Sequence, residues 1–194
     1  MKKILYDNQM FTLQRFGGVT RYFADLMYNL PQGEFVADMP MRYCENHYVT
    51  ETYGHKYDTI SFPSNYRIRR QIYMLANKHA SWKAIRFNDF DIFHPTYFDP
   101  YFLKSVNRRQ KPFVLTVHDM TFERYPQDVL IYDRTIPNKR RLIAEADHII
   151  AVSENTKRDI VELIGTDPSK ISVVHHGYRP VQECAPQLFD RYVL

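Results

Sequence analysis

Two short segments of this sequence combine residue types that could bind and activate a ligand. Gly17 and Gly18 stand directly before an amphipathic segment that begins at Val19. Glycine lets the backbone approach a ligand closely, and free N–H groups at the start of a helix attract a phosphate. His118 follows an apolar run, where its imidazole can donate to an anion or a hydroxyl, and Asp119 can orient it or contact a second substrate. A tight turn and a loop-capping histidine are the structural alternatives.

Three further histidines follow predicted strands. His94 lies directly before Pro95, and we expect its role to be structural. His175 and His176 follow another apolar run but have no partner at the spacing of metal ligands. We therefore expect no metal and no other cofactor.

Several familiar catalytic and nucleotide-binding motifs do not fit the chain. The sequence contains neither G-x-G-x-x-G nor G-K-[ST], which argues against a dinucleotide fingerprint and a P-loop. It also lacks the G-x-S-x-G elbow that presents a nucleophilic serine in hydrolases. Cys44 and Cys184 belong to no C-x-x-C pair, so we expect two reduced thiols rather than a disulfide framework or a zinc site.

Short apolar runs alternate with segments of helical periodicity along the chain. Strands are expected over residues 4–6, 35–39, 59–62, 91–94, 113–117, 149–152 and 171–174. Helices are expected over 19–30, 68–76, 138–146 and 153–164, and more weakly over 82–87. This alternation predicts an α/β fold with a mostly parallel sheet and helices on both faces. Ligands of such sheets bind beyond the carboxyl ends of the strands, where both candidate segments fall.

The composition is that of an ordinary globular domain. The chain has 194 residues, of which 44% are hydrophobic and 25% charged, enough for one full domain. No apolar run approaches the ~18 residues of a membrane span, and residues 1–7 lack the apolar core of a secretory signal. We therefore expect a cytoplasmic protein.

The charge and the aromatic content leave several partners open. The formal net charge is +4, and basic residues gather at 67–70, 108–111 and 139–141. Such clusters can meet nucleic acid, phosphosugars or anionic lipids, or can be solvated helix faces. Aromatic residues make up 15% of the chain, which hints at a flat or sugar-like ligand.

Four segments, in the same order along the chain, resemble family 4 glycosyltransferases. Residues 14–23, QRFGGVTRYF, are similar to the glycine-rich first loop of that family, and residues 116–119, TVHD, to its T-x-H-D segment. Residues 146–157, ADHIIAVSENTK, resemble its A-D-x-I-[IL]-x-V-S segment. Residues 170–177, KISVVHHG, resemble K-I-x-V-[IV]-x-N-G, with His176 where asparagine is usual.

The resemblance implies the GT-B architecture, in which two Rossmann-like domains face each other across a cleft. Residues 1–178 would form the N-terminal, acceptor-side domain, and 179–194 a linker and the first strand of an otherwise absent C-terminal domain. The implied reaction transfers a hexose, with retention, from a nucleotide-sugar to a saccharide or lipid-linked acceptor, in cell-surface polysaccharide biosynthesis. The family's E-x7-E segment and basic phosphate-binding pair belong to the C-terminal domain, so the 194-residue chain is expected to be inactive alone.

The resemblance also suggests roles for individual residues. His118 would be catalytic, contacting the donor sugar near the reacting carbon. The residues expected to bind the donor are Gly17, Gly18, Arg21, Ser153 and Glu154. Those expected to bind the acceptor are Asp119, Tyr97 and Phe98.

Other readings of the chain remain. A stand-alone sugar-binding or regulatory module without catalysis is the alternative, because aromatic residues are abundant. Nucleic-acid binding is suggested only by the basic clusters, and we expect no such partner. Peripheral contact with the inner face of the membrane would also use these clusters.

Overall fold

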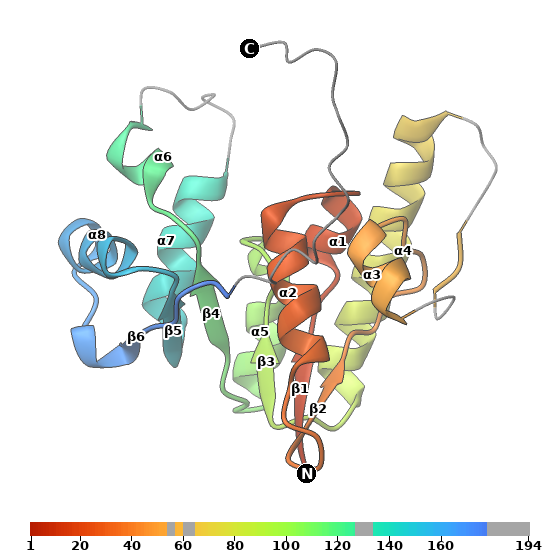
Figure 1. The fold of residues 1–194 in the computed structure, drawn as a ribbon, viewed down its shortest axis with the longest axis horizontal. Helices are drawn as coiled ribbons and strands as arrows, with labels where there is room; N and C mark the ends of the chain where they lie inside the picture. Colours follow the sequence, from red (N-terminus) through yellow and green to blue (C-terminus); the bar gives the residue numbers. More distant parts are fainter. Residues whose placement is uncertain (54–56, 60–64, 127–133, 178–194) are drawn as a thin grey trace, which may run out of the picture.

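The computed structural model describes residues 1–53, 57–59, 65–126 and 134–177, and Figure 1 shows how their elements are arranged. The strands are β1 (Lys2–Tyr6), β2 (Phe35–Asp38), β3 (Ile92–His94), β4 (Val114–Val117), β5 (His148–Ala151) and β6 (Ile171–Val173). The α-helices are α1 (Gln9–Leu13), α2 (Gly18–Tyr28), α3 (His47–Tyr53), α4 (Tyr66–Phe87), α5 (Leu103–Arg108), α6 (Thr121–Arg124), α7 (Thr135–Glu145) and α8 (Glu154–Ile164). Two short 3₁₀ helices are η2 (Pro100–Phe102) and η4 (Pro168–Lys170).

The strands form two parallel sheets of three strands, in the orders β2-β1-β3 and β4-β5-β6. A parallel bridge between Phe93 and Phe113 joins the sheets at their edges, and the Phe93 N–H donates to the Pro112 carbonyl at 3.0 Å. Parallel pairing brings the carboxyl ends of neighbouring strands to the same edge. The predicted α/β fold of the Rossmann-like type is confirmed, with two joined sheets in place of one.

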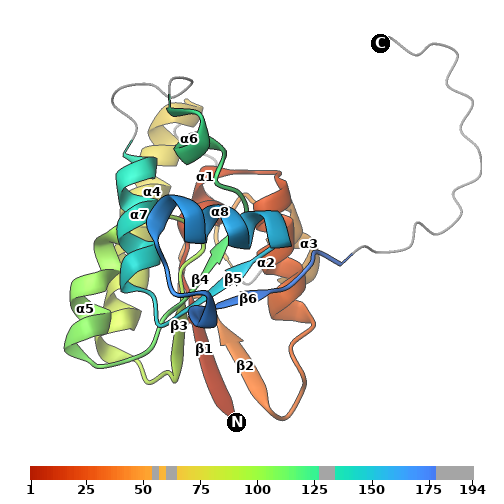
Figure 2. The ribbon, with the colours of Figure 1, turned by 90° about the vertical axis from the view of Figure 1, so that its left-hand side faces the viewer.

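Helices cover both faces of the strands. Figure 2 shows α4, α5 and α7 on one side and α2 and α3 on the other. Leu5 packs in the core shared with β3, β4 and β5, whereas its neighbour Tyr6 packs against α1, α2 and α3. Successive side chains of a strand point to opposite faces, so β1 contributes to both cores.

The structure corrects several boundaries predicted from the sequence. Residues 68–76 and 82–87 belong to one helix, α4, and the connection after β1 contains α1. The end signals of α8 are confirmed, because the Ser153 side chain accepts from the Thr156 N–H and Gly165 adopts φ 77°. Most of the strand expected at 59–62, the linker at 179–194 and Cys184 lie outside the described residues.

The Asp7 carboxylate connects the carboxyl ends of β1 and β3. It is fully buried, and its Oδ1 accepts from the backbone N–H and the hydroxyl of Thr96 at 2.9 and 2.7 Å. Its Oδ2 accepts from Gln9 Nε2 at 2.7 Å and from the Tyr101 hydroxyl at 3.3 Å. Burial raises the pKa of Asp7, and the hydrogen bonds from Thr96 and Gln9 oppose that rise. The carboxylate therefore holds together the ends of β1 and β3, where the following loops begin.

Replacing Asp7 with alanine should lower the free energy of unfolding by roughly 2–3 kcal/mol, because buried donors on Thr96 and Gln9 lose their acceptor. Asp7→Asn, which keeps one acceptor oxygen, should lose less. The exposed Asp89→Ala variant is the control and should change stability by less than about 0.5 kcal/mol. Urea unfolding measures all three variants, and equal losses for Asp7→Ala and Asp89→Ala would contradict the structural role of Asp7.

Candidate functional site

A groove of about 750 Å³ opens between the carboxyl ends of β4 and β6 and one face of α2, from Gly18 at its start to Asn29 at its end. Its walls come from three segments of the chain that are distant in sequence. The lining residues are Gly18, Val19, Arg21, Tyr22, Asp25, Leu26, Asn29, His118, Val174, His175, His176 and Gly177. The groove therefore combines both segments that the sequence analysis singled out.

Three aromatic rings meet in the groove. The rings of His118 and His176 are stacked, with centroids 5.5 Å apart and an interplanar angle of 10°. Tyr22 stands edge-on to both, at 5.1 Å from each centroid. Its hydroxyl also lies 3.3 Å from Thr116 Oγ1, a hydrogen bond that fixes the tyrosine against the end of β4. The family motif assigns no clear role to His176, and the structure makes this residue part of the ring cluster.

His118 is a neutral imidazole at physiological pH. Burial lowers its pKa to about 4, helped by His176 and Lys139 and opposed by Asp119. Its Nε2 is buried and has no hydrogen-bond partner among the described residues. This nitrogen is a donor or an acceptor according to the tautomer, and it is enclosed by the surrounding protein.

His94 lies behind this cluster and serves the fold. It is buried, hydrogen-bonded through Nε2 to Thr116 Oγ1 at 2.9 Å, and in ring contact with Tyr6 and Phe23. Burial lowers its pKa to about 3, with a smaller contribution from His118. These contacts agree with the structural role predicted for His94.

The glycine pair forms the start of α2. The Gly17 carbonyl accepts from the Arg21 N–H at 3.0 Å and from the Thr20 hydroxyl at 2.9 Å. A Cβ on Gly17 would lie 2.0 Å from Oε1 of Gln14, whose side chain occupies that space. Gly18 has nothing within 4 Å of its Cβ position and lines the groove. The loop thus presents bare backbone to a ligand at a helix N-terminus, an arrangement suited to an anion.

Comparison with known protein families assigns the chain to one of them. The sequence model of Glycosyltransferase Family 4 matches residues 16–181, which span the glycine loop, β4, α8 and β6. The chain belongs to glycosyltransferase family 4. No curated protein matches the chain in a sequence search. The resemblance inferred from the four segments is thereby confirmed at the level of the family.

Only part of the donor site expected in this family 4 domain lies on the groove. Gly18 and Arg21 line it, and Arg21 is paired with Asp25 at 3.6 Å. Ser153 instead caps α8, and Glu154 is exposed in the first turn of that helix. Neither residue lines the groove, and their donor-binding roles stay predictions.

The residues expected to bind the acceptor lie outside the groove lining. Asp119 is exposed, and its Oδ1 accepts from the Thr121 N–H at 3.0 Å. The rings of Tyr97 and Phe98 are 4.9 Å apart, with Phe98 buried and Tyr97 packed against the same core. None of the three lines the groove, so an acceptor role for them stays a prediction.

A buried ion pair supports the loop that carries His118. Lys139 Nζ lies 2.9 Å from Glu123 Oε2, and the two side chains are 3% and 0% exposed. The same ammonium donates to the Asp119 carbonyl at 3.1 Å. The sequence groups Lys139 with its neighbours in the basic cluster 139–141, which was expected to meet a partner or solvent. Its side chain is instead buried. No local sequence signal connects it to Glu123.

Among the described residues, no group of three histidine, cysteine, aspartate or glutamate side chains is placed to hold a metal ion. Within the same part of the chain, no helix has the length and hydropathy needed to span a membrane.

Breaking the buried pair should destabilise the family 4 domain. Lys139→Met leaves the Glu123 carboxylate buried without its partner and should cost roughly 3–5 kcal/mol in urea unfolding. The Lys139→Met/Glu123→Leu double variant should recover most of that loss. Arg141→Met, which breaks an exposed pair with Glu145, is the control and should cost less than about 1 kcal/mol. A double variant no more stable than Lys139→Met would contradict the pairing.

Acid should weaken the domain partly through His118. An unfolded histidine titrates near 6.5, whereas folded His118 has a pKa of about 4. Between these values the unfolded chain binds a proton that the folded chain does not. The contribution of His118 is therefore complete above about pH 6.5 and is lost as the pH falls toward 4.

The Tm measured at pH 7.5 and at pH 5 tests this effect. His118→Asn should show a smaller drop in Tm than the unmodified chain, and the exposed His79→Asn control should show the full drop. If His118→Asn and the unmodified chain lose the same Tm, His118 does not titrate as described.

Proposed function

We propose that the groove is the acceptor-side half of a glycosyltransferase active site, in which a hexose passes from a nucleotide-sugar to a saccharide or lipid-linked acceptor. The observation that carries this proposal is the meeting of Gly18, at the start of α2, and His118, at the end of β4, in one groove. Glycosyl transfer needs a site for a leaving diphosphate beside a group that contacts the sugar. In this proposal the start of α2 provides the diphosphate site, and His118 contacts the sugar.

The chemistry of the groove suits this reaction. As the glycosidic bond to the nucleotide breaks, negative charge grows on the leaving diphosphate and positive charge on the sugar ring. The backbone of the glycine loop and the N-terminus of α2 stabilise the diphosphate electrostatically. Neutral His118 lines the groove and contacts the sugar without adding positive charge beside the ring. Retention of configuration is part of the proposal, and no nucleophile is assigned.

The proposed enzyme completes its site with a second domain. In this proposal, residues 179–194 lead into a C-terminal domain that holds most of the nucleotide-sugar, and the 194-residue chain is inactive alone. We further propose that the enzyme needs no metal, acts in cell-surface polysaccharide synthesis in the cytoplasm and contacts the inner face of the membrane.

A transfer assay on the product of the complete open reading frame tests this function. The protein is supplied with a panel of nucleotide-sugars and of saccharide and lipid-linked acceptors, and release of nucleoside diphosphate is measured. His118→Ala should lower kcat by about 100-fold or more, since a donor group that acts on the transition state is lost. His79→Ala is the matched control and should retain full activity. Unchanged kcat in His118→Ala would remove this residue from the mechanism.

A sugar-binding module without catalysis is the second candidate, favoured by the three rings of Tyr22, His118 and His176 in the groove. Saturable oligosaccharide binding by the 194-residue chain, together with no acceptor-dependent nucleotide release by the full product, would favour the module over the enzyme.

A further inference from the structure

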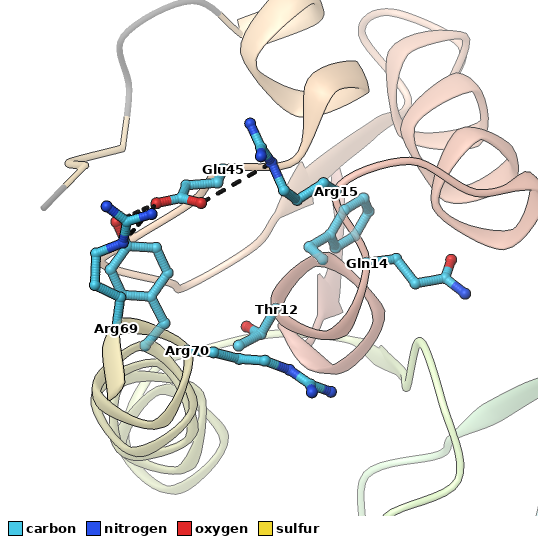
Figure 3. A pocket seen from close by; sticks show the side chains of 8 residues that line it. Thr12, Gln14, Arg15, Glu45, Arg69 and Arg70 are labelled. Carbon is cyan, nitrogen blue, oxygen red and sulfur yellow. Dashed lines mark hydrogen bonds and ion pairs between the residues drawn. The ribbon is translucent and has the colours of Figure 1, made fainter. Parts of the chain in front are cut away.

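A second, much smaller hollow lies at the other end of the glycine loop. Its volume is about 20 Å³, and Figure 3 shows the side chains around it. The lining residues are Phe11, Thr12, Gln14, Arg15, Glu45, Arg69, Arg70 and Tyr73. Three arginines and one glutamate line the hollow, which leaves an excess of two positive charges, although Figure 3 shows the guanidinium of Arg70 pointing away from Glu45. An arginine keeps its charge at any physiological pH, so this excess is permanent.

Glu45 occupies little of the hydrogen-bonding capacity of these arginines. Figure 3 shows Arg15 and Arg69 approaching the carboxylate from opposite sides, with Nε atoms 4.0 and 3.8 Å from its oxygens. Both distances exceed that of a hydrogen bond. The Tyr73 hydroxyl, by contrast, donates to Glu45 Oε1 at 3.1 Å. Within the part of the chain that the structure describes, most of the five N–H donors on each guanidinium therefore have no acceptor.

Two further observations, one on Arg69 and one on Arg70, indicate that an acceptor is missing from this hollow. Arg69 Nε is buried and has no hydrogen-bond partner among the described residues. Arg70 extends from α4 toward Thr12, and it forms no ion pair within the described part of the chain. A buried donor without an acceptor is costly, and an anion at this point would remove that cost.

The size and charge of the hollow indicate which kind of anion fits it. A volume of about 20 Å³ admits a group of about the size of one water molecule, such as a single phosphate oxygen. The rest of the phosphate would then lie at the mouth of the hollow. A phosphate monoester carries close to two negative charges and balances the excess, whereas a carboxylate carries one. Planar guanidinium groups also bind phosphate oxygens in pairs.

The hollow and the groove are the two ends of one loop. Gln14 and Arg15 line the hollow, and Gly18, three residues after Arg15, lines the groove. The loop is anchored between them, because the Gln14 carbonyl accepts from Asn46 Nδ2 at 2.8 Å and the Arg15 carbonyl from the His47 N–H at 2.9 Å. A ligand lying along this loop reaches both sites.

We propose that Arg15, Arg69 and Arg70 bind a phosphate group carried by the acceptor substrate, while the reacting hydroxyl lies in the groove. The assignment to the acceptor rests on the proposed function; the phosphate site itself does not. The phosphate comes either from a soluble phosphorylated saccharide or from the head group of a lipid, and the same three arginines would recognise it in both.

Titration of the 194-residue chain with inorganic phosphate at low salt tests the site directly. Shifts of the arginine Nε–H resonances in nitrogen-15 NMR spectra report the binding. Arg70→Gln and Arg15→Gln should each weaken phosphate binding by about tenfold, the loss of one charge-assisted hydrogen bond. Arg70→Lys should recover part of the affinity, because it keeps the charge but not the paired donors.

Arg67→Gln is the matched control, since Arg67 is exposed on the same turn of α4 but does not line the hollow. It should bind phosphate as tightly as the unmodified chain. An equal loss in Arg67→Gln and Arg70→Gln would overturn the proposal, because general surface charge would then explain the binding. Full affinity in both Arg15→Gln and Arg70→Gln would overturn it as well.

Vesicles distinguish the two sources of the phosphate. Phosphatidylcholine vesicles with added phosphatidic acid should bind the chain, and bind Arg15→Gln/Arg70→Gln much less, if the source is a lipid. Binding of inorganic phosphate without vesicle binding assigns a soluble source. If phosphate binds as expected but the complete product transfers no sugar, the proposed function fails and the site stands. If sugar is transferred but no arginine variant alters phosphate binding, the site fails alone.

Discussion

Parallel pairing of the strands is the constraint on which the rest of the domain depends. Because β1, β3, β4 and β6 all end at the same edge, the loops that follow them meet in space although up to about 160 residues separate them. The glycine loop, His118 and His176 come together for this reason alone. Buried Asp7 reinforces the constraint at the junction of β1 and β3, where it fixes two loops through one carboxylate.

The buried charged groups of the domain are paired or hydrogen-bonded, whereas positive charges exceed negative charges around the glycine loop. Glu123 and Lys139 form an ion pair beneath the His118 loop, and Asp7 accepts hydrogen bonds from Thr96 and Gln9. At the glycine loop, by contrast, three arginines and a single glutamate line the small hollow. In the groove, His118 stays neutral because burial and a second imidazole oppose its protonation. The edge is thereby suited to anionic and hydroxyl-rich ligands, as expected of a glycosyltransferase.

Sequence patterns predicted the elements whose signals are local. Parallel strands are short apolar runs, and α8 carries its own cap residues, Ser153 and Gly165. Helix α4 was divided in two because its periodicity is weak: Leu75 is exposed, whereas Asn77 and Ser81 are buried. His118 and the glycine pair could be found from strand ends and family motifs. The ring contact of His176 and the hydrogen bond of Thr96 to Asp7 could not, because their partners are distant in sequence.

The seam between the two sheets has a consequence for the groove. Within the described residues, β3 and β4 are joined by a single bridge, at Phe93 and Phe113, whereas strands inside each sheet pair over three or four residues. Tyr22 is carried by a helix that packs on the first sheet, while His118 and His176 follow strands of the second. The aromatic cluster therefore straddles the line along which the two sheets share the least backbone pairing. The width of the groove at this line is set by side chains, because Leu5 and Phe93 of the first sheet pack in one core with Leu115 and Ile149 of the second.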